Sequence, residues 1–380
     1  MRSARSPVAT SCNRETLFMR KAPLLAAGTL VSAALAFAAL GPVAAPVLAA
    51  AAQGQPGIPA SGAKVDADNQ AVLDALKGLG LRPYHTLSPA EARLQPSFAD
   101  GVKAVLQKQG RPVAPPPGVA TQDIQVAGGA GPIPARVYRP ADAQGPLPVI
   151  VYYHGGGWVL ATIDTYDASA RALAREARAI VISVEYRKAP EAKFPAQHDD
   201  ALAAYRWALG HAGEIGGDPR KIALAGESAG GNLALATAIA ARDAKLQKPA
   251  HVLTIYPIAG SDLNTPSYQE NANAMPLNRA AMAWFLHHTT RGPADATDPR
   301  INLVAANLRG LPPVTLIQAQ IDPLTSEGQT LAGRLRAAGV PVATQLYPGV
   351  THEFFGADAV IRKAGEAQRF AGTRLKASFR

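Results

Sequence analysis

Short apolar runs alternate with amphipathic segments along most of the chain, and this alternation most limits the folds open to it. Six runs predict buried strands: 148–153, 179–184, 221–225, 252–255, 314–318 and 342–346. Five segments predict helices: 167–178, 196–211, 229–242, 326–338 and about 358–375. Strands that are apolar on both faces and separated by helices indicate a mostly parallel sheet with helices on either side. With an antiparallel pair expected at 121–126 and 134–138, the sequence predicts an α/β fold with an eight-stranded sheet.

Two helical regions lie outside this alternation. In residues 65–118, apolar residues at helical spacing predict helices, with Ser88 as an N-cap three residues before Glu91 and a break at Pro96. Residues 260–309 hold one further expected helix and are too long for a plain connection. We therefore expect both regions to form a helical cap over the active site.

The expected domain organisation follows from these regions. Residues 119–259 and 310–380 form the core, 260–309 is the cap insertion, and 65–118 contributes its helices to the cap. Residues 53–64, rich in Gly, Pro and Ala, predict a disordered leader.

Residues 1–52 predict a secretory signal peptide. Arg20 and Lys21 precede an apolar stretch at 24–48, and the alanines at 49–52 offer cleavage sites. A membrane anchor is the alternative, but glycines and prolines interrupt the apolar stretch. We expect a periplasmic or secreted protein with no stable membrane span after signal removal.

The composition narrows the class of protein further. Cys12 is the single cysteine, so a chain cleaved after residue 52 has no disulfide. Translation could equally well start at Met19, which would leave Cys12 out altogether. The formal net charge of +10 is scattered, without a basic stripe, which argues against nucleic-acid binding. No metal-binding motif is present, so we expect neither a metal nor another cofactor.

Ser228 is the candidate nucleophile. It lies in a G-x-S-x-G run between a predicted strand and a predicted helix, the context in which this motif exposes the serine hydroxyl. Gly226 and Gly230 suit a turn too tight for side chains, and the helix dipole behind Ser228 favours developing negative charge. The alternative is a glycine-rich connection with an incidental serine.

The run 154–158, His-Gly-Gly-Gly-Trp, supplies a candidate oxyanion hole. Its glycines let main-chain N–H groups approach a ligand atom, and we assign Gly156, Gly157 and Ala229 as the donors. His154 is expected to orient this loop by hydrogen bonding. A phosphate-binding loop is excluded because the G-K-[ST] ending is absent.

The base and acid are expected on late loops at the same edge of the sheet. His352 follows the 342–346 strand and is the candidate base, while Asp322 follows the 314–318 strand and is the candidate acid. Asp262 and Glu327 are the competing acids, with Glu327 expected to cap or brace a helix.

With these residues assembled, the chain resembles the bacterial hormone-sensitive lipase-like esterases, a family of α/β-hydrolases, over about residues 65–376. The motifs that carry the resemblance are 154–158, 185–191, 226–231, 322–328 and 352–355. The resemblance implies an α/β-hydrolase fold with a helical cap and the catalytic set assigned above.

Five positions depart from the family pattern. Glu227 stands where Asp or Thr is usual, Lys188 replaces a leucine, and Glu353 replaces a common glycine. Thr325 and Ser326 replace an Arg-Asp pair. None of these changes removes a catalytic atom, but they alter the shape and charge expected around the pocket.

The sequence therefore predicts a serine carboxylic-ester hydrolase that forms an acyl-enzyme. Trp158 at the pocket mouth and Glu227 beside the nucleophile are the expected substrate contacts and suggest short to medium acyl chains. A non-catalytic small-molecule binder on the same fold and an amidase or peptidase with the same triad stay open. The oligomeric state is not readable, with a homodimer as one option.

Overall fold

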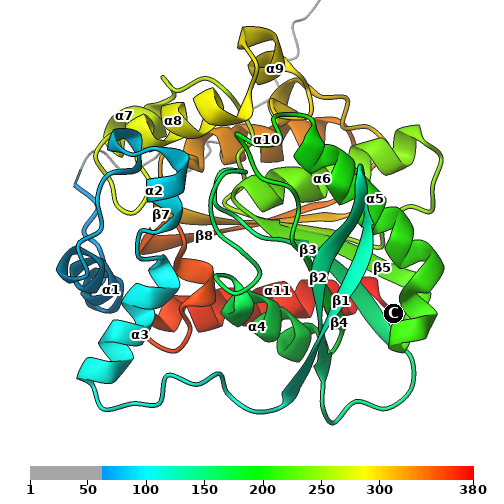
Figure 1. Ribbon diagram of the computed structural model, residues 1–380. Helices are drawn as coiled ribbons and strands as arrows, with labels where there is room; N and C mark the ends of the chain where they lie inside the picture. The colour runs from blue at the N-terminus through cyan, green and yellow to red at the C-terminus, as the bar shows by residue number, and fades with distance from the viewer. Residues whose placement is uncertain (1–61) are drawn as a thin grey trace, which may run out of the picture. The chain divides into compact units, whose positions relative to one another are not determined.

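The computed structural model describes residues 62–380, so the expected signal peptide and most of the leader lie outside the described residues. A sheet of eight strands, in the order β1-β2-β4-β3-β5-β6-β7-β8, runs through the structure (Figure 1). The strands are β1 Val119–Gly128, β2 Gly131–Pro140, β3 Leu147–Tyr153, β4 Ile180–Val184, β5 Gly217–Glu227, β6 Val252–Ile255, β7 Val314–Ile321 and β8 Val342–Thr351. β2 is antiparallel to β1 and β4, and the other neighbours are parallel. The predicted α/β fold is confirmed.

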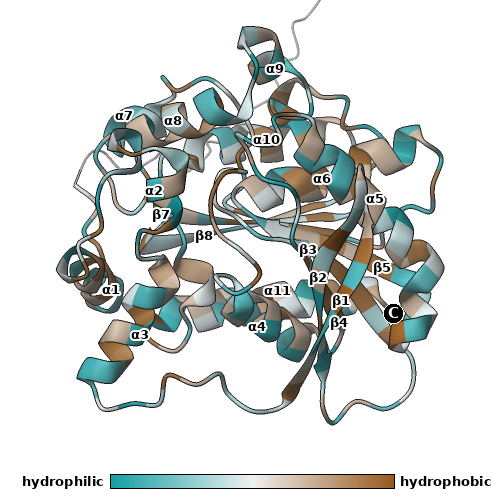
Figure 2. Cartoon of the chain, in the orientation of Figure 1, coloured by the Kyte–Doolittle hydropathy of each residue, from teal (hydrophilic) through white to brown (hydrophobic). Residues whose placement is uncertain are grey.

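Helices cover both faces of this sheet. α4 (Asp167–Ala177) and α11 (Arg362–Ser378) belong to the apolar cluster on one face. The other cluster contains α5 (Ala196–His211), α6 (Ala229–Asp243) and α10 (Thr325–Ala337). Alternate residues of β3 enter the two clusters, and Figure 2 shows hydrophobic residues concentrated on the strands between the helices. Burial on both faces explains why these strands read as continuous apolar runs.

The N-terminal region forms α1 (Ala67–Gly78), a 3-10 turn η1 (Tyr84–Thr86), α2 (Pro89–Arg93) and α3 (Phe98–Lys108). The predicted capping box is present: the Ser88 hydroxyl accepts from the Glu91 N–H, and the Glu91 carboxylate accepts from the Ser88 N–H. Ser97 and Asp100 form a second capping box, with which α3 begins after the break at Pro96. Satisfying the free N–H groups in this way stabilises such short helices.

The insertion carries α7 (Pro266–Glu270), α8 (Arg279–Thr289), α9 (Pro293–Thr297) and the turn η3 (Leu303–Ala305). α8 packs on the N-terminal region, since the Trp284 indole donates to the Leu87 carbonyl at 3.0 Å and the Phe285 ring lies 6.0 Å from that of Tyr84. We call residues 84–100 and 276–289 together the cover.

Several boundaries differ from those expected, two of them next to His352. β8 continues to Thr351, which pairs with Ile321 after a register shift, and so carries the chain directly to His352. α11 begins at Arg362 rather than near 358, because a 3-10 turn at 354–356 comes first. No helix among residues 62–380 has the length and apolar character needed to cross a bilayer.

Candidate active site

Ser228 occupies a strained turn between β5 and α6. Its backbone angles are φ 56° and ψ −117°, a conformation that side-chain-bearing residues rarely adopt. The Ser228 N–H donates to the Ile255 carbonyl at 2.9 Å, which anchors the turn to β6. A Cβ added to Gly226 would collide with the Gly230 backbone, and one added to Gly230 would collide with Tyr153. The two glycines are therefore required by close backbone approach, as the motif predicts.

The structure brings Ser228, His352 and Asp322 together from three strand ends. The His352 Nε2 atom lies 2.9 Å from the Ser228 hydroxyl oxygen, and Nδ1 lies 2.7 Å from the Asp322 carboxylate. All three side chains are buried. Burial alone disfavours the charged imidazolium, but the charge and hydrogen bond of Asp322, with Glu353 and Glu227, raise the pKa of His352 above its ordinary value. This arrangement can take a proton from the serine hydroxyl.

Neither competing acid reaches the imidazole. Asp262 is exposed and accepts a hydrogen bond from the Asn264 N–H. Glu327 is buried in α10 and accepts from the Ala259 N–H at 2.7 Å, and burial raises its pKa to about 8. Glu327 thus braces the chain after β6, whereas the sequence predicts that it caps or braces its own helix.

The glycine loop after β3 lies against the cover. Gly156 and Gly157 have φ of 91° and 59°, and an added Cβ would collide with Leu160 at Gly156 and with the Phe285 ring at Gly157. Within residues 62–380, neither glycine N–H has a hydrogen-bond partner, and the Ala229 N–H lies in the first turn of α6, where helices leave donors free. These three donors are available for an oxyanion.

His154 has the orienting position expected for it. Its Nδ1 lies 2.8 Å from the Gly155 carbonyl, and its ring stacks on Tyr186 at 4.4 Å. The Tyr186 hydroxyl donates to the His154 carbonyl at 2.8 Å. Burial lowers the pKa of His154 to about 4, so the ring is neutral and can donate to the loop.

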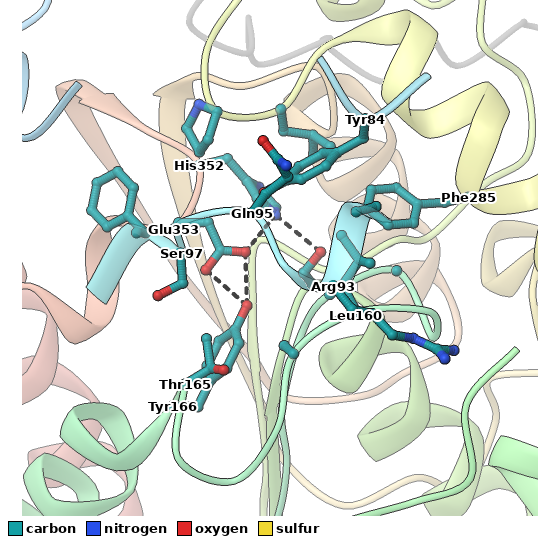
Figure 3. Close-up of a pocket in the computed structure, with 18 of the residues that line it drawn as sticks. Tyr84, Arg93, Gln95, Ser97, Leu160, Thr165, Tyr166, Phe285, His352 and Glu353 are labelled. Carbon is teal, nitrogen blue, oxygen red and sulfur yellow. Dashed lines mark hydrogen bonds and ion pairs between the residues drawn. The ribbon is translucent and has the colours of Figure 1, made fainter. Parts of the chain in front are cut away.

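A cavity of about 320 Å³ opens beside the nucleophile (Figure 3). Ser228, His352, Gly156 and Gly157 line its base. The cover supplies much of the remaining wall: Tyr84, Ala92, Arg93, Gln95, Ser97, Phe98, Asp100, Pro276, Leu277, Met282 and Phe285. Both parts of the cover, separated by more than 170 residues of sequence, thus shape one pocket.

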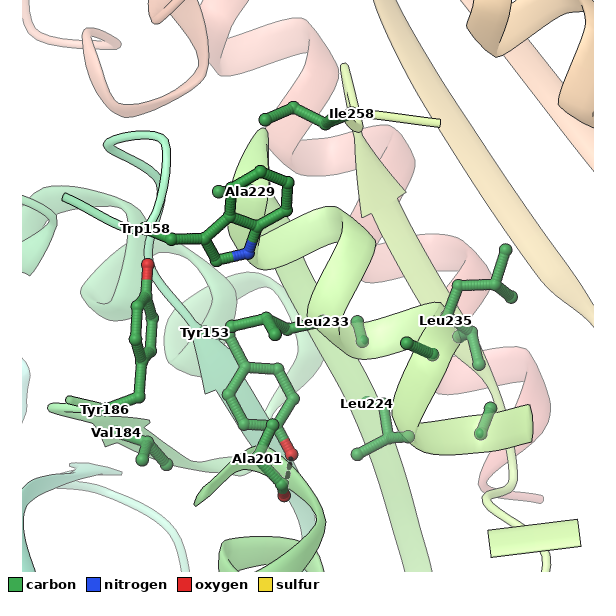
Figure 4. Packing of buried hydrophobic residues seen from close by; sticks show 14 of the residues in the cluster. Tyr153, Trp158, Val184, Tyr186, Ala201, Leu224, Ala229, Leu233, Leu235 and Ile258 are labelled. Atoms are coloured by element: carbon green, nitrogen blue, oxygen red, sulfur yellow. Dashed lines mark hydrogen bonds between the residues drawn. The ribbon is translucent and has the colours of Figure 1, made fainter. Parts of the chain in front are cut away.

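The two expected substrate contacts lie elsewhere, which corrects that prediction. Trp158 is fully buried and does not line the cavity; its indole packs beside Ala229 in the apolar cluster under the glycine loop (Figure 4). Glu227 is also buried outside the cavity, where Tyr152 and Tyr256 donate to its carboxylate. Both residues act on the loop and turn from behind rather than on the substrate.

Sequence reasoning missed most of the cavity wall. No sequence motif marks Tyr166, although its hydroxyl donates to both oxygens of Glu353 at 2.7 Å. The one sequence signal at this place is that Glu353 departs from the family pattern. Apart from the capping box at Ser88 and Glu91, the cover carries no motif that marks a cavity wall, because its contacts depend on packing between distant segments.

Comparisons with known proteins agree with this geometry. A model of the alpha/beta hydrolase fold matches residues 150–356. Carboxylesterase NlhH of Mycobacterium tuberculosis is 43% identical over 239 residues, which are 62% of this chain and 75% of that protein. The ethyl acetate hydrolase of Pseudomonas putida is 34% identical over 290 residues, 75% of this chain and 88% of its own. The solved hyperthermophilic esterase from Pyrobaculum calidifontis is 35% identical with a TM-score of 0.74, covering 83% of this chain and 98% of that one.

A nucleophile turn at the end of β5, with a histidine and an acid from later strand ends, defines a serine hydrolase of the α/β-hydrolase class. The match to the family model and the sequence identity to known esterases place the chain in one family within this class. The chain belongs to the hormone-sensitive lipase-like esterases, the family that its motifs indicated.

Proposed function

We propose that the chain is a serine carboxylic-ester hydrolase in which Ser228 is the nucleophile, His352 the base and Asp322 the orienting acid. The hydrogen bonds on both nitrogens of the His352 ring carry this proposal, since one ring must contact both partners to transfer a proton. Ester hydrolysis follows from the family and from the esterase names of its relatives.

The geometry leads to a two-step reaction. His352 Nε2 takes the proton of the Ser228 hydroxyl as its oxygen attacks the ester carbonyl, and the N–H groups of Gly156, Gly157 and Ala229 receive the oxyanion. The imidazolium, held by Asp322, returns the proton to the departing alcohol and leaves an acyl-serine. A water activated by the same nitrogen then releases the acid.

The cavity supports substrates with short to medium acyl chains. Its volume of about 320 Å³ is at the small end of ligand pockets, and leucine, methionine and phenylalanine side chains of the cover line it. The size of the cavity replaces Trp158 as the reason for this preference.

Replacing the nucleophile tests the function. Ser228→Ala should lower kcat on 4-nitrophenyl butanoate by about 10⁶-fold, because the acyl-enzyme cannot form. The parent protein should also react covalently with a fluorophosphonate probe, and Ser228→Ala should not. A variant that hydrolysed the ester at the parental rate would end the proposal.

We also propose that the protein is exported. The basic pair at 20–21, the apolar stretch at 24–48 and the small residues at 49–52 support this. Cell fractionation and N-terminal sequencing of the mature protein test it, and an uncleaved chain in the cytoplasm would contradict it.

A further inference from the structure

The residue after the catalytic histidine has an unusual backbone. Glu353 has φ 73°, in the left-handed region where glycine is favoured. A side chain held in such a conformation at an active site points to a function for that side chain. The same backbone turns Glu353 toward the cavity, which it lines together with Ser228 and His352.

The Glu353 carboxylate keeps unused acceptor capacity. Tyr166 donates one hydroxyl to its two oxygens, each at 2.7 Å, as Figure 3 shows. A carboxylate offers about four lone-pair positions, so a single donor leaves most of them open. The side chain is 22% exposed, and that exposure faces the cavity that it lines.

Glu353 also differs from the other charged side chains of the cavity. Arg93 is paired with Glu191, Lys188 with Glu185, and Asp100 with Lys103. In the part of the chain that the structure describes, no Lys or Arg pairs with Glu353, whose nearest basic group is His352. Its carboxyl oxygens are therefore not held by a Lys or Arg side chain and can accept a hydrogen bond from a ligand.

The position of the carboxylate relates it to one half of the substrate. Glu353 Oε1 lies 4.0 Å from His352 Nε2, and the same nitrogen lies 2.9 Å from the Ser228 hydroxyl oxygen. In ester cleavage this nitrogen protonates the leaving alcohol. The carboxylate is therefore beside the alcohol half of a bound ester, within a few bonds of the ester oxygen.

We propose that Glu353 is a specificity-determining residue that accepts a hydrogen bond from a hydroxyl group on the alcohol half of the ester. The favoured substrates are then monoesters of short diols or polyols. A neutral hydroxyl fits better than an ammonium group, because Arg93 and Lys188 also line the cavity. This inference rests on the proposed ester hydrolysis and names the substrate class of the same site.

A matched pair of esters tests the inference. 2-Hydroxyethyl butanoate and propyl butanoate have the same number of non-hydrogen atoms and give the same butanoyl-enzyme, so their kcat/KM values differ only through the alcohol half. In Glu353→Gln the ratio of kcat/KM for 2-hydroxyethyl butanoate to kcat/KM for propyl butanoate should fall by about tenfold. A hydrogen bond to a charged group contributes enough free energy for a change of that size or more. Comparing ratios between variants removes the intrinsic reactivity of each ester.

Asp100→Asn is the matched control, because Asp100 also lines the cavity but is already bonded to Ser97 and Lys103. Its ratio should equal the parental one. Glu353→Gly, which suits the left-handed backbone, serves as a second variant if Glu353→Gln folds poorly, and it should lower the ratio similarly.

One result would overturn the inference: an unchanged ratio in both Glu353 variants. This covers the case in which kcat/KM falls equally on both esters, which a merely structural role of Glu353 would give. This failure differs from that of the proposed function, in which the parent protein would hydrolyse neither ester.

Discussion

The strand ends and the cover build one pocket in different ways. At the strand ends, backbone geometry positions the reacting groups: glycines at 226 and 230 allow the Ser228 turn, and β8 leads directly to His352. In the cover, short helices meet through side chains, such as the Trp284 indole on the Leu87 carbonyl. The strand ends therefore position the reacting groups, and the cover supplies much of the wall that the substrate meets.

The difference lies in the kind of constraint. A turn that only glycine can form leaves a local signal in the sequence. In residues 84–100 and 276–289, local signals mark helices but not which side chains line the cavity. Changes to the reacting groups at the strand ends should therefore affect all esters alike. Changes to side chains that contact one half of the substrate, such as Leu277 in the cover, should alter the ratio between esters.

After the loss of the nucleophile itself, the largest effect is expected at the acid. Asp322→Asn should lower kcat by about 10⁴-fold on every ester, because an amide leaves His352 in the wrong tautomer. Steady-state kinetics with acetate and butanoate esters measure it. Asp262→Asn, at the exposed competing position, should retain parental kinetics, and a large loss there would contradict the assignment.

Gly157→Ala tests the place where the two regions touch. The added methyl group would collide with the Phe285 ring and displace an oxyanion donor, so kcat should fall by about 100-fold to 1000-fold. Gly157→Ala combined with Phe285→Ala should recover part of the loss. If the double variant is as slow as the single one, the constraint lies in the loop backbone and not in its contact with the cover.

Glu327, which holds the chain after β6, should make the free energy of unfolding depend on pH. Because burial raises its pKa to about 8 from an ordinary 4.5, the folded state holds the proton more tightly than the unfolded state. Its contribution to the free energy of unfolding is therefore fully present below about pH 4.5 and is lost as pH rises towards 8. Glu327→Gln, which cannot ionise, should flatten this dependence.

Chemical denaturation at several pH values measures the effect. Glu227, whose pKa burial raises to about 7, should leave a residual slope in the Glu327→Gln variant. If the Glu327→Gln variant kept the full pH dependence of the parental free energy of unfolding, Glu327 would not titrate in this pH range.

The smallest effect is expected from trimming the cover. Leu277→Ala enlarges the cavity and should raise the kcat/KM ratio of octanoyl to butanoyl esters by a few-fold, up to about tenfold. Leu94→Ala, at a leucine of the same cover that is 85% exposed and does not line the cavity, should leave the ratio unchanged. Equal ratios in all three proteins would indicate that the cover does not sort acyl chains.

The sequence predictions were correct where local patterns determine structure and wrong where packing between distant segments does. The strands and the main helices were predictable because burial on both faces gives apolar runs and capping boxes mark helix starts, as Ser88 does for α2. The prediction that Trp158 contacts the substrate was wrong, because its φ of 63° and the packing under the glycine loop place the indole in the core.

By itself the sequence determined the sheet, the nucleophile turn and the candidates for base and acid, since each depends on local backbone rules that residue types reveal. Only the tertiary structure decided among the acids, because Asp322 and Asp262 both follow strands and differ in which of them reaches His352. It also decided the cavity wall and the exposure of Glu353, because side-chain contacts between distant segments depend on packing that no local pattern records.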